Sequence, residues 1–523
     1  MDFERFVMTG RSGESSRKEM VRVGAVLLFL VGIVMFLTSR AGQVHFSLVV
    51  AAMIGGYMAL NIGANDVANN VGPAVGSRAL TMGGAILVAA IFEMAGALVA
   101  GGDVVGTIKS GIINPASIVD KEVFIWLMTA ALLAGALWLN IATASGAPVS
   151  TTHSIVGGVL GAGIAAGGWD IANWGELSKI AASWVISPVL GGVIAAAFLY
   201  LIKRTITYQA DMLAAARRWV PVLQAVMAWA FTTYLIMKGL RQIWRVDFQV
   251  AALVGLAFAA LTYLVMRLRL AAVAPSLSND KSGVNSLFVL PLIFSAALLS
   301  FAHGANDVAN AVGPLAAINE AVTQGAVAAK AAIPVWVLMI GAIGIALGLA
   351  LYGPKLIKTV GSGITELDQM RAFCISMAAA ITVIIASQLG LPVSSTHIAV
   401  GAVFGVGFLR EYIKSHYGQM IYAIEEHHAG HDQEVVEAYL SKFHKAGFDE
   451  KGHMLAELKA SKQAVVDSHL TKKERKSLKG VYRKELVKRS ALARIVAAWL
   501  ITVPISAAMA AMLFFMIRGM MLP

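Results

Sequence analysis

The chain alternates between long apolar runs and short polar connections. About thirteen apolar segments of roughly 20 residues recur, and each is long enough to cross a lipid bilayer as an α-helix. They begin near residues 21, 46, 80, 122, 145, 180, 220, 248, 286, 331, 369, 391 and 491. This pattern predicts an all-α polytopic membrane protein with about 12–13 transmembrane segments. The first run follows a basic stretch but lacks a clear small-residue cleavage site, so we interpret it as a retained helix.

Two motifs occur twice, in the same order along the chain. GANDVANNVGP begins at Gly63 and returns from Gly304 as GANDVANAVGP, 241 positions later. GAPVSTTHSIVGGVLG at 146–161 returns as GLPVSSTHIAVGAVFG at 390–405, and SWVISP has a weaker match in AWLITVP. Paired motifs in the same order indicate that one structural unit is used twice.

These repeats divide the chain into six expected parts. They are an N-terminal tail with an extra transmembrane helix at 1–45, transport repeat 1 at 46–203, linking helices at 204–285, transport repeat 2 at 286–409, a polar helical cytoplasmic insert at 410–490 and the final helix of repeat 2 at 491–523. The insert contains EEHHAGHD, which is either a metal site or a polar helix with scattered histidines. The absence of cysteine there favours the polar helix over a zinc site.

Composition and charge support a membrane protein. The chain is 58% hydrophobic and 14% charged, whereas soluble domains average about 45–50% apolar and about 25% charged residues. Its net charge of +12 is best explained by Lys and Arg in cytoplasmic loops, so we expect no nucleic-acid partner.

The same loop charges predict the orientation of the repeats. An N-terminus on the inner side gives seven crossings between the starts of the two repeats, and an odd number inverts one relative to the other. Inverted repeats with broken helices or hairpins that meet at a midplane site are typical of secondary transporters. The pattern leaves open whether segments 145–166 and 391–409 cross the membrane or re-enter it.

Each copy of the first motif places an Asn-Asp pair and a second Asn inside an apolar segment. A carboxylate in hydrocarbon costs at least about 2.5–3.5 kcal/mol, so such acids are functional by default. Carboxylate and amide oxygens suit a small alkali cation, and flanking Gly and Pro predict broken helices with free carbonyls. Asn amides also donate hydrogen bonds and could contact an anion. The alternative is a helix-packing motif, which duplication disfavours. The motif residues are Asn65, Asp66, Asn69, Asn306, Asp307 and Asn310.

Each copy of the second motif follows Pro with three hydroxyl side chains at an expected helix start. Free backbone N–H groups there bind anions, and hydroxyls add donors without charge, as a tetrahedral oxyanion that must be released requires. The alternative is ordinary helix capping. The hydroxyl residues are Ser150, Thr151, Thr152, Ser394, Ser395 and Thr396. The adjacent His153 and His397 could bind substrate, relay a proton, orient a hydroxyl or make a structural hydrogen bond.

Three further charges lie within or near apolar segments. Glu93 is either a cation ligand or a partner for Lys109. Lys109 and Lys358 lie near segment ends, where a lysine commonly extends its ammonium to the membrane surface.

The paired motifs resemble those of the inorganic phosphate transporter (PiT) family. FEMAGALVAGGDVVGTIKSGII and the Asn-Asp and PVS[TS]TH motifs carry this resemblance over nearly the whole chain from about residue 46, except 410–490. It implies sodium-coupled symport of inorganic phosphate in the plasma (inner) membrane by a multi-pass homodimer, with sodium as coupling ion and no other cofactor. By motif, the six hydroxyl residues with Asn69 and Asn310 would hold phosphate. Asn65, Asp66, Asn306 and Asp307, with Glu93, would hold sodium, and His153 and His397 would lie behind these groups.

Other functions remain as alternatives. Proton-coupled transport of phosphate or metal-phosphate, or transport of sulfate, would keep the same fold. An intramembrane hydrolase would need two acids, or a nucleophile and a base, converging at one asymmetric centre. The candidate residues instead come as equivalent pairs, which suits a translocation path. Uphill accumulation of the anion would exclude a channel.

Overall fold

In this computed structural model the described part of the chain is helical. It comprises residues 2–39, 45–118, 120–145, 149–239, 246–324, 333–363, 367–426 and 489–521. Within these ranges eleven helices are long and apolar enough to cross a membrane, which confirms an all-α polytopic protein. Helix α7 (Thr151–Gly167), which the sequence also counted as a segment, has 17 residues and is not among the eleven. Most of the expected insert at 410–490 lies outside the described residues.

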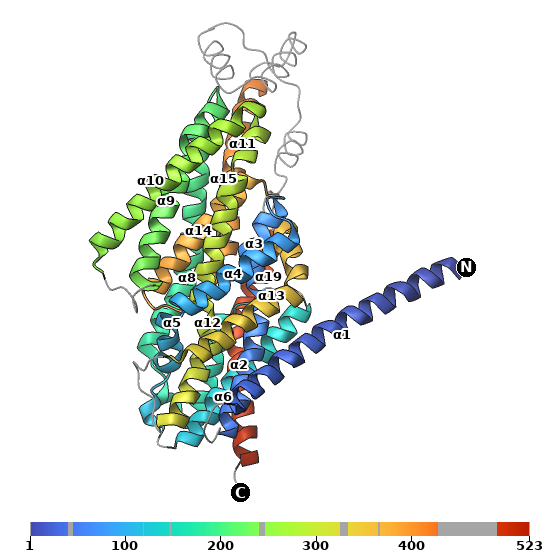
Figure 1. Ribbon diagram of the computed structural model, residues 1–523, viewed down its shortest axis with the longest axis vertical. Coiled ribbons are helices and arrows are strands. Elements are labelled where there is room, and N and C mark those ends of the chain that lie inside the picture. The colour runs from blue at the N-terminus through green and yellow to red at the C-terminus, as the bar shows by residue number, and fades with distance from the viewer. Residues whose placement is uncertain are drawn as a thin grey trace.

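The helices follow the two repeats (Figure 1). Before and within repeat 1 they are α1 (Asp2–Thr38), α2 (Phe46–Asn65), α3 (Val67–Gly76), α4 (Met82–Ala100), α5 (Gly102–Gly106), the π-helix η1 (Thr107–Gly111), α6 (Lys121–Ser145), α7 and α8 (Trp174–Ile202). Two linking helices follow, α9 (Met212–Tyr234) and α10 (Phe248–Val273). Repeat 2 holds α11 (Lys281–Leu287), α12 (Val289–Gln324), α13 (Val335–Gly363), α14 (Gln369–Gln388), α15 (Ser395–Glu426) and α19 (Arg489–Met521).

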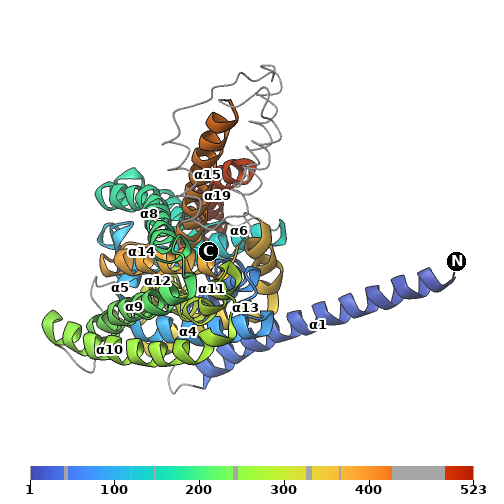
Figure 2. The same ribbon diagram turned by 90° about the horizontal axis from the view of Figure 1, so that it is seen from above.

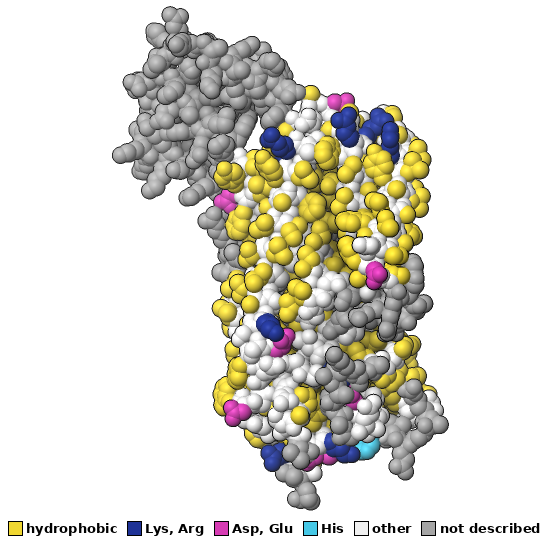
Figure 3. All heavy atoms as spheres, turned by 90° about the vertical axis from the view of Figure 1, so that its left-hand side faces the viewer, with side chains coloured by type: hydrophobic (Ala, Val, Ile, Leu, Met, Phe, Trp, Pro, Cys, Tyr) yellow, Lys and Arg dark blue, Asp and Glu magenta, His cyan; other side chains and the backbone are white. Residues whose placement is uncertain are grey.

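Basic side chains mark one face of the molecule as the inner face. Lys203 and Arg204 follow α8, Arg267 and Arg269 lie near the end of α10, and Lys281 begins α11. Figure 3 shows a group of Lys and Arg side chains at the upper end of a mostly hydrophobic surface, with others lower down and at its lower end. By the positive-inside rule we expect this end to face the cytoplasm, and we call it the inner end. The C-terminus lies at the opposite, outer end (Figure 1).

Segments 145–166 and 391–409, for which the sequence left open a crossing or a re-entrant path, each belong to a helical hairpin. Helix α6 packs beside α7, and α14 packs beside α15. The hairpin tips contact the Asn-Asp motifs, since Thr151 bonds Asp66 and Ser395 bonds Asp307. Asp307 lies near the middle of the 36-residue helix α12, so the tips reach about half the depth of the bundle. The hairpins enter from opposite faces, with α6 at the outer end and α15 at the inner end (Figure 1). Since each hairpin replaces two crossings, the repeats remain inverted.

The helix is interrupted at only one of the two Asn-Asp motifs. Asp66 separates α2 from α3, whereas α12 runs without interruption past Asp307. The broken helix expected at the second motif is therefore absent. The glycines that suggested it allow close helix packing instead. A Cβ at Gly63 would collide with the backbone of Ile345, and a Cβ at Gly304 with that of Glu93.

Replacing Gly304 with alanine should therefore destabilise the fold. The added methyl group would push α12 from α4, and overpacking of this kind costs about 1–3 kcal/mol. Gly83→Ala is the matched control, because Gly83 lies in the first turn of α4 with nothing within 4 Å of its would-be Cβ. Thermal unfolding in detergent should show a lower midpoint for Gly304→Ala and an unchanged or higher one for Gly83→Ala. Equal midpoints would contradict this packing argument.

Helix α1 stands apart from the helical bundle. In its apolar part, Glu19–Thr38, only 11% of the residues of the most apolar window are buried. Figure 2 shows α1 extending away from the other helices. It packs mainly against the start of repeat 1 through α2. The helix thus adds only a few side chains to the interior, among them the buried Ile33 and Leu37.

Candidate functional site

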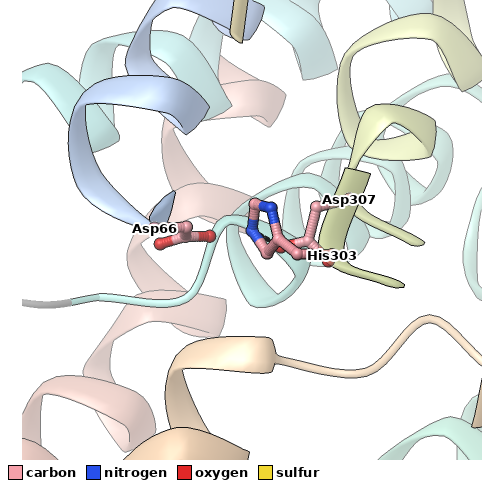
Figure 4. Close-up of side chains that lie close together, drawn as sticks. All are labelled: Asp66, His303 and Asp307. Atoms are coloured by element: carbon pink, nitrogen blue, oxygen red, sulfur yellow. Dashed lines mark ion pairs between the residues drawn. The ribbon is translucent and has the colours of Figure 1, made fainter. Parts of the chain in front are cut away.

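The two motif aspartates come together in the interior. Asp66 lies at the break between α2 and α3, Asp307 lies within α12, and both are at most 1% exposed. His303, one turn before Asp307, completes a group whose ligand atoms all lie within 4.8 Å of one another. Figure 4 shows the imidazole between the two carboxylates. Three buried ligand groups this close could together hold a cation.

Hydroxyls from both hairpin tips surround the aspartates. Thr151 at the start of α7 donates to Oδ2 of Asp66 at 2.6 Å, and Thr396 in the first turn of α15 donates to Oδ1 at 3.1 Å. Ser395 donates to Oδ2 of Asp307 at 3.2 Å. Asp66 is therefore bound by hydroxyls from both repeats.

The second asparagine of each motif reaches across to the other repeat. Asn69 on α3 donates to the Thr396 hydroxyl at 2.8 Å, and Asn310 on α12 donates to the Thr152 hydroxyl at 3.1 Å. These residues are equivalent in the two repeats, so the two contacts form a symmetric pair. Asn310 also lies 3.1 Å from the hydroxyl oxygen of Thr151. These contacts between the repeats at the site are therefore made by neutral donors.

The first asparagine of each motif contacts the C-terminal end of the first helix of a hairpin. This helix is α6 for Asn65 and α14 for Asn306. With its amide oxygen accepting from the Thr143 hydroxyl, Asn65 donates to Asp66 Oδ1 at 3.2 Å. Asn306 donates to the Ser387 hydroxyl at 2.9 Å. Thr143 and Ser387 are equivalent in the two repeats and were not singled out from the sequence.

The first hydroxyl of each PVS motif caps its own helix. Ser150 Oγ accepts from the backbone N–H of His153 at 3.1 Å, and Ser394 Oγ accepts from that of His397 at 3.2 Å. Ser150 and Ser394 therefore use the capping contact that the sequence offered as an alternative. The next two hydroxyls in each motif point toward the aspartates and asparagines.

The two PVS-motif histidines meet each other. The rings of His153 and His397 lie 4.4 Å apart between centroids, and each contacts a tryptophan, Trp184 or Trp499, at 3.8 and 3.5 Å. Within the described residues none of the four imidazole nitrogens has a hydrogen-bond partner. The two rings and two indoles therefore form an aromatic cluster across the seam between the repeats, in which His397 stacks on Trp499 and His153 meets Trp184 edge-on.

One side of the site carries a polar cluster, hereafter the triad, formed by Asn70, Glu93 and His303. Asn70 donates to Glu93 Oε1 at 2.7 Å, and His303 Nδ1 lies 2.7 Å from Glu93 Oε2. The other ring nitrogen, Nε2, lies 3.0 Å from Asp307 Oδ2. Glu93 thus contacts the site through His303 and lies outside the three-residue group that could hold a cation.

The triad breaks the symmetry between the repeats. The repeat offset pairs His303 with Ile62 and Asn70 with Ala311. Because the equivalent glycines Gly304 and Gly63 pack on Glu93 and Ile345, these two residues also correspond. The counterparts of three polar side chains are therefore all apolar. This difference between HGAND and IGAND was visible in the sequence, but we had not singled out His303 or Asn70.

The expectations for Lys109 are wrong. Lys109 is 3% exposed and forms an ion pair with Glu320 of α12, not with Glu93. Its ammonium does not extend to the surface, whereas Lys358 is exposed. Sequence spacing could not find Glu320, because the two residues lie in different repeats.

Comparisons with known proteins agree with this architecture. A model described as "Phosphate transporter family" matches residues 62–510. A Helicobacter pylori protein named "Putative phosphate permease" is 53% identical over 96% of both chains, and a Pyrococcus abyssi protein of similar name is 40% identical over 69% of this chain and 89% of its own. A solved structure titled "The sodium-dependent phosphate transporter" is 32% identical, with a TM-score of 0.74, and the match covers 91% of this chain and 100% of that one.

Proposed function

The chain belongs to the phosphate transporter family, and we propose that it is a sodium-coupled symporter of inorganic phosphate that works by alternating access. The observation that carries the proposal is the meeting of two hairpin tips, which bring three hydroxyls to two buried carboxylates and a fourth, that of Thr152, to Asn310. A hydrolytic centre would need asymmetric acid and base roles, and this family is one of transporters rather than enzymes.

The proposed phosphate site lies between the starts of α7 and α15. Free backbone N–H groups at two helix N-termini attract an anion. Thr151, Thr152, Ser395 and Thr396 would supply hydroxyl donors, and Asn69 and Asn310 would supply amide donors that now bond those hydroxyls. Ser150 and Ser394 would act by capping the two helices. Neutral donors hold a tetrahedral oxyanion while still allowing its release.

The proposed sodium site lies on the aspartates. Asp66 and Asp307 would provide carboxylate oxygens, and Asn65 and Asn306 would orient them or add amide oxygens. Oxygen ligands suit a hard alkali cation, and its charge would offset that of the carboxylates beside the incoming anion. The solved neighbour is titled a sodium-dependent transporter, which supports sodium as coupling ion. Glu93 would act indirectly by holding His303, and His153 and His397 would support the hairpin tips from behind.

The hairpins suggest how access alternates. One enters from each face, and both tips stop at the aspartates. Movement of one hairpin with its flanking helices would open the site to one face while the other hairpin keeps it closed. As the resemblance implied, we place the transporter in the plasma membrane as a homodimer.

A second candidate is proton-coupled phosphate transport. It is favoured by one observation, the contact of His303 with both Glu93 and Asp307. A carboxylate–imidazole–carboxylate chain could take up a proton in place of a sodium ion. Sulfate remains the alternative cargo within the same fold.

Labelled phosphate uptake into proteoliposomes tests these proposals. An inward sodium gradient should drive uptake that excess sulfate does not inhibit, and a proton gradient alone should not. Uptake driven by protons alone would favour the second candidate. Sulfate uptake without phosphate uptake would overturn the cargo.

Removing one hydroxyl should weaken phosphate binding. Thr152→Val keeps the shape of the side chain but removes a hydroxyl that donates to the carbonyl of Val393 and accepts from Asn310, and one hydrogen bond is worth about 0.5–1.5 kcal/mol. The KM for phosphate should rise by up to about tenfold. Thr129→Val is the matched control, because this buried threonine on α6 bonds only its own helix, at Ile125. An equal KM for both variants would remove Thr152 from the proposed phosphate site.

A further inference from the structure

A buried ion pair lies between the candidate site and the outer face. Lys109 of η1 and Glu320 of α12 are 3% and 4% exposed. Glu320 follows Asp307 by 13 positions, which places it about 20 Å further along the helix axis. It is four residues from the end of α12, whose N-terminus follows the basic inner end of α11. The pair is therefore on the outer side of the site.

The short π-helix that carries Lys109 joins several parts of the outer half. Two residues before Lys109, the Thr107 hydroxyl donates to the carbonyl of Gly390 at 2.8 Å. Gly390 lies in the tip between α14 and α15, just ahead of the PVSSTH hydroxyls. On the other side of η1, Ile108 packs so closely on Gly313 of α12 that no Cβ would fit there. Hence η1 connects α12 with the tip that carries half of the proposed phosphate site.

The segment after η1 is fixed to the outer ends of α7 and α8. Asn114 N–H donates to the carbonyl of Ile171 at 2.9 Å, and Asn173 N–H donates to that of Ile112 at 3.0 Å. One end of this connection is therefore anchored by backbone bonds. The contacts that join η1 to α12 and to the α14–α15 tip include one side-chain hydrogen bond, one ion pair and apolar packing, which can separate without unfolding a helix.

The inner half has no equivalent of this arrangement. The offset that pairs Glu93 with Ile345 pairs Lys109 with Gly361, in the uninterrupted helix α13, so no lysine stands at the equivalent position. The repeat offset pairs Glu320 with Ala79. The ion pair is thus a feature of one face rather than of the repeated unit.

We propose that the Lys109–Glu320 ion pair is the lock of an outer gate, and that η1 is the gate segment. The inference rests on the proposed alternating access. When the pair separates, both charges regain water and η1 releases Gly390, so the tip that carries Ser395 and Thr396 becomes open to the outer face. Desolvation opposes the pair while mutual attraction holds it, which allows the gate to open and close reversibly.

The test measures access from the outside, not transport. Ala317→Cys introduces a thiol one turn inward of Glu320, at a position that is fully buried. Its reaction with a membrane-impermeant maleimide, in full-length protein in right-side-out vesicles, reports opening of the gate. Cys374 is also fully buried, and labelling of the protein without Ala317→Cys gives its background.

Breaking the lock should speed this labelling. We expect Glu320→Gln to raise the rate at least tenfold and the exchange Lys109→Glu with Glu320→Lys to return it to near the original value. Glu122→Gln, which removes another carboxylate near the outer face in the first turn of α6, should leave it unchanged. If Glu320→Gln does not fold, Thr107→Val still tests the gate, since loss of its bond to Gly390 should raise the rate several-fold.

An unchanged labelling rate in the folded Glu320→Gln and Thr107→Val proteins would overturn the gate. Faster labelling without recovery in the charge exchange would remove the ion pair as its lock. If the labelling follows the expected order but no variant or parent protein takes up phosphate, the gate stands and the proposed transport function fails. The two proposals are therefore separated by one set of variants.

Discussion

Asp66→Asn is expected to reduce sodium-driven phosphate uptake strongly, and Asp307→Asn to do the same. The substitution keeps the shape of the side chain but removes its charge and one acceptor. At Asp66 two hydroxyls, from Thr151 and Thr396, donate to the carboxylate, and an amide would oppose one of them with its own donor. Loss of a charge-assisted contact costs about 1.5–3 kcal/mol, so uptake should fall about 10- to 150-fold.

The dependence of uptake on sodium identifies the cause of this loss. If Asp66 binds the coupling ion, the sodium concentration for half-maximal uptake should rise by a larger factor than the phosphate KM. Asp368→Asn is the matched control, because Asp368 lies outside the site and caps α14 through the backbone N–H of Arg371. Wild-type uptake by Asp66→Asn at every sodium concentration would exclude the carboxylate from coupling.

The sequence predicted the membrane class, the duplication and the residues that meet at the centre. It could do so because Asp66 and Asp307 occupy equivalent positions in an inverted pair, and equivalent positions near the pseudo-twofold axis must approach each other. The apolar runs did not distinguish a crossing from a hairpin. Helices α6 and α14 have 25 and 20 residues, long enough to span a membrane, so only their contacts with the motifs reveal where they turn.

The features that the sequence missed are those that depart from symmetry. The residues that the repeats share are the motif residues, whereas His303 and Asn70 each occur in one repeat only. The partner of Lys109 could not be found for a different reason. Glu320 lies more than two hundred positions away in the other repeat, and pairing across repeats depends on packing that no local pattern encodes.

The triad raises the question of whether it serves stability or transport. Both nitrogens of His303 face carboxylates, and all three triad side chains are fully buried. Removing one partner of such a pair leaves a buried charge and costs about 3–5 kcal/mol. Glu93→Gln should therefore lower the thermal unfolding midpoint markedly and reduce uptake with it. That result alone would not separate the two roles.

A variant that carries the apolar counterparts of the triad separates a role in stability from a role in transport. Combining Asn70→Ala, Glu93→Ile and His303→Ile installs the residues found at Ala311, Ile345 and Ile62. Apolar side chains of similar volume often replace a buried ion pair at no cost, so the unfolding midpoint should recover to near that of the parent. Uptake should stay at least tenfold lower, because Asp307 loses the imidazole at 3.0 Å and the two aspartates become equivalent. Parental uptake by this variant would show that the triad serves folding alone, whereas loss with restored stability assigns the asymmetry of the site to transport.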